Sequence, residues 1–148
     1  MPAFQSSRMV GYSPDKMFDL VADVERYPEF LPLCEGLTIR RRSTLEDGRE
    51  VLLADMTVGY KAIRETFTSR VTLDRSNLRI DVEYVDGPFS HMENIWRFKA
   101  DGVNSKVEFS INYQFKSRML GLLMGGMFDQ AFRRFADAFE KRAATIYR

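Results

Sequence analysis

The sequence contains few of the residues that catalytic and metal sites most often use. It has one cysteine, Cys34, and one histidine, His91, which excludes an internal disulfide and the usual Cys/His zinc clusters. Lysine and arginine number 22 against 21 aspartate and glutamate, so the chain has no overall attraction for nucleic acid. Its first residues lack a signal-peptide pattern, and no apolar run reaches the roughly 18 residues of a membrane span. We therefore expect a cytoplasmic protein in a reducing compartment, with at most peripheral contact with the inner membrane.

Large apolar side chains are abundant by contrast. The 148 residues include twelve phenylalanines, six tyrosines and eight methionines. A chain of this length buries about two thirds of its unfolded surface when it folds as one unit. We therefore expect residues 1–148 to form a single domain with a largely aromatic interior.

The C-terminal segment, residues 116–148, has two different halves. In its first half, residues 119–128 carry no charge and include Gly121, Gly125 and Gly126, each of which weakens a helix by about 1 kcal/mol relative to alanine. The pattern predicts a flexible hinge followed by a long, stable helix. The second half repeats apolar residues at helical spacing, and its stripe consists of Phe128, Ala131, Phe132, Phe135, Ala138, Phe139 and Ile146.

The N-terminal part alternates as a strand over residues 3–10 and then changes to a helical pattern. Ser13 is a good N-cap, and Pro14 suits the first position of a short helix. The prolines of the following segment, ERYPEFLPLC, allow at most a second short helical turn, which we expect to begin at Pro28.

From residue 36 to residue 115 the apolar period is alternating rather than helical. Six strands are expected, divided by turn signals at Asp47-Gly48, Val58-Gly59, Ser76-Asn77, Asp86-Gly87-Pro88 and Asp101-Gly102. With residues 3–10 they predict an α+β fold in which a curved antiparallel sheet of about seven strands surrounds the C-terminal helix, with two short helices after the first strand. Such a sheet can enclose an apolar cavity, or aromatic side chains can fill it as a core; the pattern leaves both open.

Four segments carry a resemblance to a known family: YSPDKMFDLVADVERYPEFLPLC (12–34), VDGPF (85–89), WRF (96–98) and DAFEKRA (137–143). They resemble the coenzyme Q-binding protein family of the START-like, or helix-grip, superfamily of polyketide cyclases and lipid-transfer domains. The bacterial ribosome-association toxin shares this fold. The resemblance implies a domain that binds ubiquinone or a similar isoprenoid lipid between helix and sheet and supports cellular respiration as a carrier or chaperone. It implies no enzymatic activity, and the quinone would be a bound ligand rather than a cofactor.

The candidate ligand-binding residues come from the family signatures and from the strand pattern. The aromatic-proline signature falls on residues 27–32 and the loop signature on residues 86–89, both expected at the rim of the cavity. Glu65 and Asn94 are in phase with apolar neighbours, so each can point inward and offer a hydrogen bond to a polar head group. Glu65 can equally pair with an arginine or lie near the sheet edge. The candidates for the cavity and its mouth are Tyr27, Phe30, Leu31, Glu65, Phe67, Val82, Phe89, Asn94, Trp96, Met124, Phe128 and Phe132.

The uncharged segment 119–128 is the candidate portal. Lys116 and Arg118 precede it, and cations beside an apolar face suit an anionic lipid surface. Its methionines add deformable surface of the kind used against variable apolar partners. The alternative is a helix end that only packs on residues 27–33. The candidate membrane-facing or portal residues are Met119, Leu120, Leu123 and Met127.

A ribosome-binding regulator of translation is the main alternative function. Binding to ribosomal RNA requires a basic surface, and the only notable run, Arg40 to Arg42, alternates between the two faces of a strand. The surface would be larger if folding gathered other arginines beside this run, the candidates being Arg64, Arg70, Arg75 and Arg79. We expect no binding to DNA.

A small-molecule cyclase is the third alternative, with Glu65 and Asn94 as acid and base. The other reactive side chains give it little support. Cys34 has no paired histidine and fits a small buried residue, while His91 is out of phase with the apolar face of its strand and is expected at the surface.

Overall fold

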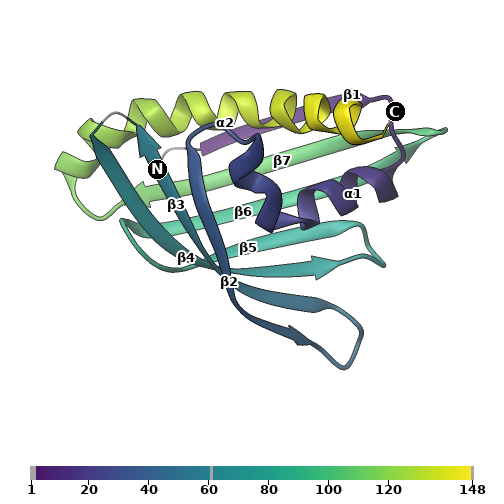
Figure 1. Ribbon diagram of the computed structural model, residues 1–148, viewed down its shortest axis with the longest axis horizontal. Coiled ribbons are helices and arrows are strands. Elements are labelled where there is room, and N and C mark those ends of the chain that lie inside the picture. The colour runs from purple at the N-terminus through teal and green to yellow at the C-terminus, as the bar shows by residue number, and fades with distance from the viewer. Residues whose placement is uncertain (1–2, 61, 148) are drawn as a thin grey trace.

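The computed structural model describes residues 3–60 and 62–147, which form seven strands and three helical segments (Figure 1). β1 (Ala3–Val10) leads into α1 (Pro14–Ala22) and a 3-10 helix, η1 (Val24–Glu29). The meander consists of β2 (Cys34–Thr44), β3 (Glu50–Tyr60), β4 (Ile63–Asp74), β5 (Arg79–Asp86), β6 (Phe89–Asp101) and β7 (Asn104–Phe115). The chain closes with α2 (Arg118–Ile146).

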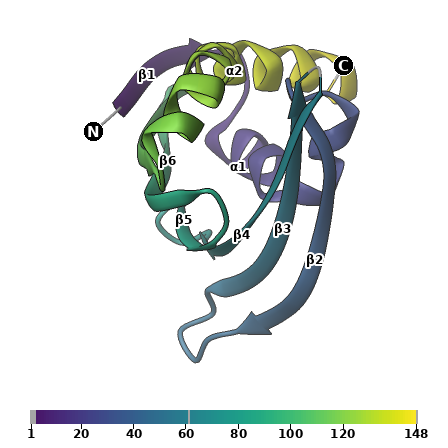
Figure 2. The same ribbon diagram turned by 90° about the vertical axis from the view of Figure 1, so that its left-hand side faces the viewer.

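The strands form one antiparallel sheet in the order β1-β7-β6-β5-β4-β3-β2. The sheet is strongly curved, and α2 lies across its open side while α1 and η1 lie within the curve (Figure 2). This is the predicted α+β helix-grip arrangement, and the prediction is confirmed.

Alternation along the strands places one side of the sheet against α2. β7 turns Val107, Phe109, Ile111, Tyr113 and Phe115 inward, and all five are buried. β6 does the same with Met92, Asn94, Trp96 and Phe98. Because side chains alternate with a period of two, the intervening residues face solvent, as the sequence predicts.

The predicted start of α1 is confirmed, whereas the second short helix begins earlier than expected. Ser13 caps α1 by accepting a hydrogen bond from the Lys16 backbone N–H at 3.3 Å. η1 begins at Val24 rather than at Pro28, which lies inside it. A 3-10 helix tolerates this proline because so short a segment contains few backbone hydrogen bonds for a proline to remove.

The expected turn at Val58-Gly59 is wrong, because both residues lie within β3. Gly59 marks a close approach instead of a turn. Its backbone N–H donates to the carbonyl of Leu33 at 3.0 Å, and the Glu35 carboxylate occupies the place that a Cβ would take. Glycine in a strand often marks such a contact, and here it joins β3 to the segment that follows η1.

Gly87 makes the tight loop between β5 and β6 possible. Its φ is +142°, and a Cβ at this position would lie 2.6 Å from the Cβ of Phe67. The following Phe89 turns inward, where its backbone N–H donates to the Tyr84 hydroxyl at 3.0 Å. The family loop signature therefore has a physical reason, since only glycine adopts this conformation and leaves room for Phe67.

The expected hinge in the C-terminal segment is absent from the structure. α2 is one continuous helix of 29 residues, and it includes all three glycines. A Cβ at Gly125 or Gly126 would have no other atom within 4 Å, and at Gly121 it would only touch Phe115. No packing contact in the described chain therefore requires these glycines, although they lower the intrinsic stability of the first half of α2.

Replacing Gly125 and Gly126 with alanine, one at a time, should stabilise the protein. Each substitution raises helix propensity without a clash, so we expect the free energy of unfolding to rise by about 0.5–1 kcal/mol per site. Denaturant unfolding followed by circular dichroism measures this change. Gly87→Ala is the matched control and should destabilise, and a loss of stability at positions 125 and 126 as well would contradict the helix geometry.

Candidate ligand-binding cavity

An apolar cavity of about 110 Å³ lies between the curved sheet and α2. Strands β3 to β7 form its floor, and one face of α2 forms its roof. Residues of η1 and the loop after it, including Tyr27 and Leu31, close the side nearest β2 and β3. The space is smaller than the 150 Å³ or so of an engineered cavity that binds benzene, so most of the interior is packed core. The sequence left open a cavity or a filled aromatic core, and the structure has a filled core around a small cavity.

Most of the candidate cavity residues lie in the cavity wall, and three do not. The residues in the wall are Tyr27, Leu31, Phe67, Val82, Phe89, Asn94, Trp96, Phe128 and Phe132. Phe30, Glu65 and Met124 lie elsewhere. The signature loop 86–89 was expected at the rim, but its Phe89 is 1% exposed and forms part of the wall. Whether the residues of the wall contact a ligand remains a prediction.

The three residues outside the wall have clear alternative environments. Phe30 packs edge-on against Phe139 at 5.2 Å, on the outer side of the mouth. Met124 is fully buried on the inner side of α2 and is not part of the cavity wall. Glu65 pairs with Val58 close to the start of β4, which is an interior strand of the sheet. Strand phase gives the face of a residue but not its distance from the cavity.

Sequence reasoning missed Ser69, the most informative polar residue of the wall. Ser69 lies two positions after Phe67 on β4 and is 6% exposed. Its hydroxyl has no hydrogen-bond partner among the described residues. Leaving a buried polar group unpaired costs about 1–3 kcal/mol. The alternation of the strand could have indicated Ser69, since it follows Glu65 and Phe67 on the same face. Only the carboxylate of Glu65 was considered as a polar group there.

Of the other polar groups of the wall, those of Tyr27 and Asn94 have intramolecular hydrogen-bond partners. The Tyr27 hydroxyl donates to the carbonyl of Val21, and burial raises the pKa of Tyr27 well above its usual value. The Asn94 amide donates one hydrogen from Nδ2 to the carbonyl of Ser110 at 2.8 Å. The indole of Trp96 adds an N–H two residues further along β6. The wall therefore offers neutral groups and no charge.

The reactive side chains of the chain lie away from the cavity. Cys34 is a free, buried thiol, and burial raises its pKa to about 11, so it is not a ready nucleophile. His91 is exposed, as the sequence predicts. Within residues 3–60 and 62–147, no three histidine, cysteine, aspartate or glutamate residues gather as metal ligands would.

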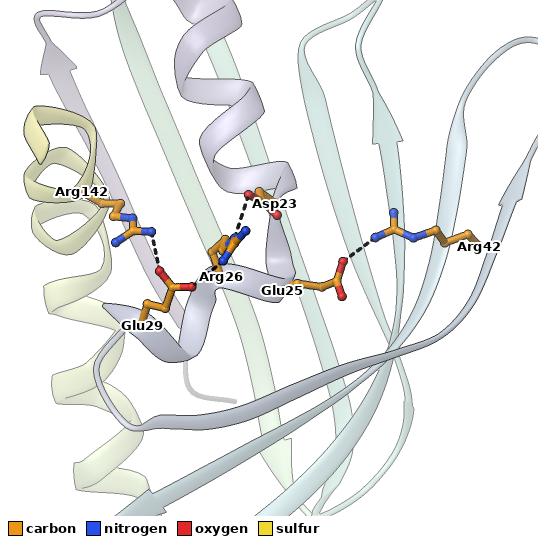
Figure 3. Close-up of polar contacts among 6 residues, drawn as sticks. All are labelled: Asp23, Glu25, Arg26, Glu29, Arg42 and Arg142. Carbon is orange, nitrogen blue, oxygen red and sulfur yellow. Dashed lines mark hydrogen bonds and ion pairs between the residues drawn. The ribbon is translucent and has the colours of Figure 1, made fainter. Parts of the chain in front are cut away.

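Ion pairs join α2 to η1 beside the mouth (Figure 3). Arg142 of α2 donates to Glu29 at 2.7 Å, and its guanidinium lies 5.1 Å from the ring centroid of Phe30. Arg26 approaches the other oxygen of Glu29 at 3.0 Å. Hydrogen bonds from Arg26 and then Arg142 lower the pKa of Glu29 below its usual value. The stability that this carboxylate adds is therefore present above its unfolded pKa of about 4.3 and is lost as the pH falls through the lowered folded value.

Two of the three arginines in the basic run on β2 form ion pairs with carboxylates. Arg42 approaches Glu25 at 2.8 Å and Glu50 at 3.1 Å (Figure 3). Arg40 lies 3.6 Å from Asp55. The arginines proposed to lie alongside are also paired in part, with Arg64 bound to Glu35, Arg75 to Asp19 and Arg79 to Asp81. These ion pairs offset part of the positive charge on these strands, while Arg41 and Arg70 are exposed.

The start of α2 exposes large apolar side chains. Met119 is 70% exposed and Leu123 is 58% exposed, whereas Leu120 and Met127 are partly buried and pack against the core. The most exposed member, Leu122 at 82%, was not among the candidate portal residues. Helical spacing predicted which residues share a stripe, but the exposed face became clear only once the position of the sheet was known. No helix in the described part of the chain is long and apolar enough to cross a membrane.

Comparison with known proteins identifies the family to which this chain belongs. The family model described as "Polyketide cyclase / dehydrase and lipid transport" matches residues 10–140. The chain belongs to this family. The match covers the described cavity wall from η1 to Phe139, so the family and the cavity concern the same part of the molecule.

Relatives with curated names include ribosome association toxins and a coenzyme Q-binding protein. The ribosome association toxin RatA of Vibrio cholerae is 34% identical over 148 residues, covering 99% of each chain. RatA of Rickettsia prowazekii is 31% identical, with the same coverage. The mitochondrial coenzyme Q-binding protein COQ10 homolog B of Xenopus laevis is 29% identical over 97% of this chain and 59% of its own length.

Solved structures of other proteins share the fold. An 18 kDa protein from Caulobacter crescentus matches with a TM-score of 0.80 and 33% identity, covering 99% of both chains. The Zhui aromatase/cyclase from Streptomyces matches with a TM-score of 0.82 at 18% identity, covering 99% of this chain and 96% of that one. At the latter identity the likeness shows the fold alone.

Proposed function

We propose that this protein binds a neutral isoprenoid quinone of the ubiquinone type in the cavity, as a carrier or chaperone for respiratory electron transport. The observation that carries the proposal is an apolar cavity whose only polar groups are uncharged. The coenzyme Q-binding name of the Xenopus relative supports the same class of ligand.

The absence of charge in the described wall distinguishes between classes of lipid. A fatty acid or a phospholipid would bring a charge into an interior that offers no counter-ion, at a cost of several kcal/mol. A quinone brings only carbonyl and ether oxygens, which accept hydrogen bonds from neutral donors. Asn94 and Trp96 supply N–H donors on β6, and aromatic rings surround them. We therefore favour a neutral, oxygen-bearing ring over a charged lipid.

The small volume implies that binding moves part of the wall. A cavity of about 110 Å³ is below the size that accepts benzene, so a substituted ring needs more room. The first half of α2 is the part best suited to move, because it contains three helix-weakening glycines and exposes much of its surface. The isoprenoid tail would leave through the mouth between η1, β3 and α2.

We propose that the domain does not act as an enzyme. The described cavity wall contains no carboxylate, histidine or thiol, so the hydroxyls of Tyr27 and Ser69 have no base beside them to activate them. The cyclase alternative used Glu65, which lies outside the cavity wall.

Extraction of the protein purified without detergent from a quinone-producing bacterium tests the ligand directly. We expect mass spectrometry and ultraviolet absorbance to find a near-stoichiometric quinone, or the protein to take up added quinone to that level. A protein that carries no quinone and fails to take it up would contradict the proposal.

The exposed apolar residues at the start of α2 would place this end of the helix on a membrane surface. Met119, Leu122 and Leu123 project into solvent, and Lys116 and Arg118 lie beside them. Cations flanking an apolar helix face favour the interface of anionic bilayers. The proposed contact is peripheral, on the cytoplasmic face of the inner membrane, where the isoprenoid tail could pass between bilayer and cavity.

Replacing Leu122 with glutamate should weaken binding to vesicles that contain phosphatidylglycerol by about tenfold. Burial of a leucine is worth about 1.5–3 kcal/mol, and about 1.4 kcal/mol corresponds to a tenfold change in affinity. Vesicle flotation measures the change. Val103→Glu is the matched control, because Val103 is 85% exposed in the turn between β6 and β7, at the far end of the sheet. Equal binding of both variants would remove the membrane contact from the proposal.

A ribosome-binding regulator is the second candidate, favoured by the relatives named as ribosome association toxins. It predicts that the protein sediments with a ribosomal subunit at low salt and is released as the salt concentration rises. A protein absent from ribosomal fractions at low salt would count against this candidate. The two functions are separable, because the cavity variants described below should not affect sedimentation.

A further inference from the structure

We infer that Ser69 anchors the head group of the bound ligand by donating a hydrogen bond to a ring oxygen deep in the cavity. This inference rests on the proposed binding of a quinone and adds the residue that selects for its oxygen. The starting observation is a serine that is 6% exposed, belongs to the cavity wall and has no hydrogen-bond partner among the described residues.

The residues paired with Ser69 on the neighbouring strands offer its hydroxyl no partner. Across the sheet it pairs with Ala54 on β3 and with Tyr84 on β5. Ala54 offers no polar side-chain atom, and the Tyr84 hydroxyl is already engaged by the backbone N–H of Phe89 at 3.0 Å. A β-bulge between β4 and β5 lies at the Thr68–Ser69 step, where Val85 of β5 is the extra, unpaired residue.

Ser69 and Asn94 approach the cavity from two sides of β5. Ser69 pairs with Tyr84, and Asn94 pairs with Val82 of the same strand. Strands lie about 4.8 Å apart, and Val82 lies two residues from Tyr84 at about 3.4 Å per residue, so these side chains start about 12 Å apart across β5. Asn94 donates one Nδ2 hydrogen to Ser110, which leaves the second for a ligand. A flat ring that carries oxygens on opposite sides fits between two donors at this separation.

The geometry therefore assigns a para-quinone orientation, with one carbonyl oxygen toward Ser69 and the other toward Asn94. Val82, between the two donors, and Phe67, two residues before Ser69, supply apolar contact for the ring. The tail then points toward the mouth at Leu31, because the polar end of the ligand lies at the sheet.

Calorimetric titration of the Ser69→Ala protein tests this assignment. The two probes are a short-tailed ubiquinone and a prenyl-substituted benzene, which has the same ring size but no oxygen. We expect the quinone affinity to fall about five- to tenfold, the size of one neutral hydrogen bond, and the hydrocarbon affinity to stay unchanged.

Ser105→Ala is the matched control. Ser105 is also a buried serine without a hydrogen-bond partner among the described residues, but it lies outside the cavity wall. We expect this variant to bind both probes as the unmodified protein does. Equal quinone affinity in the Ser69→Ala and unmodified proteins would overturn the anchor while leaving the proposed function intact. An unmodified protein that does not bind the quinone would overturn both.

Discussion

The Ala131→Leu protein should lose quinone binding by about a hundredfold or more while remaining folded. Ala131 is 4% exposed and forms part of the roof of the cavity, so the larger side chain occupies the space that a ring requires. Filling an apolar cavity often stabilises a protein by about 0.5–2 kcal/mol, although overpacking can cancel this gain. Titration with a short-tailed ubiquinone measures the affinity, and thermal unfolding measures the stability.

Ala144→Leu makes the same chemical change on the same helix at an exposed position. It should leave both affinity and folding unchanged. If Ala131→Leu bound the quinone normally, the ligand site would have to lie elsewhere on the molecule, and the cavity would be a packing defect.

The Phe139→Ala protein should lose about 3–5 kcal/mol of unfolding free energy, the cost of removing a large aromatic side chain from a packed core. Phe139 is 1% exposed and packs edge-on against three rings, those of Trp96 at 5.1 Å, Tyr27 at 5.4 Å and Phe30 at 5.2 Å. It therefore holds η1 and the mouth against β6. Denaturant unfolding followed through the fluorescence of the single tryptophan measures the loss.

Phe4→Ala is the control for this substitution. Phe4 is only partly buried on β1, where it lies 6.1 Å from Phe109 and 5.4 Å from the guanidinium of Arg133. It should cost less than half as much stability. Similar losses at positions 4 and 139 would contradict the role of Phe139 in holding η1 against β6.

The fold was largely predictable because its causes are local. Period-two alternation gives the strands and their inner faces, as in β6 and β7, and Ser13-Pro14 marks the start of α1. The failures arose where tertiary contacts override local preference. Gly59 was taken for a turn but accommodates Glu35, and Gly125 and Gly126 suggested a hinge in a helix that packing against the sheet keeps continuous.

The candidate site was less predictable than the fold. Phase placed Glu65 and Ser69 on the same inner face, but only the curvature of the sheet decides which of them reaches the cavity. The family signature pointed to Phe30 and the uncharged segment to Met124, but Phe30 packs on Phe139 and Met124 is buried on α2, both outside the cavity wall. The apolar surface formed by Leu122 and its exposed neighbours could be recognised only once α2 was known to cover the sheet with its opposite face.

Titration of the Trp96 fluorescence with a short-tailed ubiquinone is the most direct test of the central claim, because the only tryptophan of the chain lies in the cavity wall. A quinone bound in the cavity should quench it saturably with one ligand per chain, and Ala131→Leu should abolish the quenching while Ala144→Leu preserves it. Quenching that never saturates, or that is the same in both variants, would show that the quinone does not enter the cavity and would contradict the account.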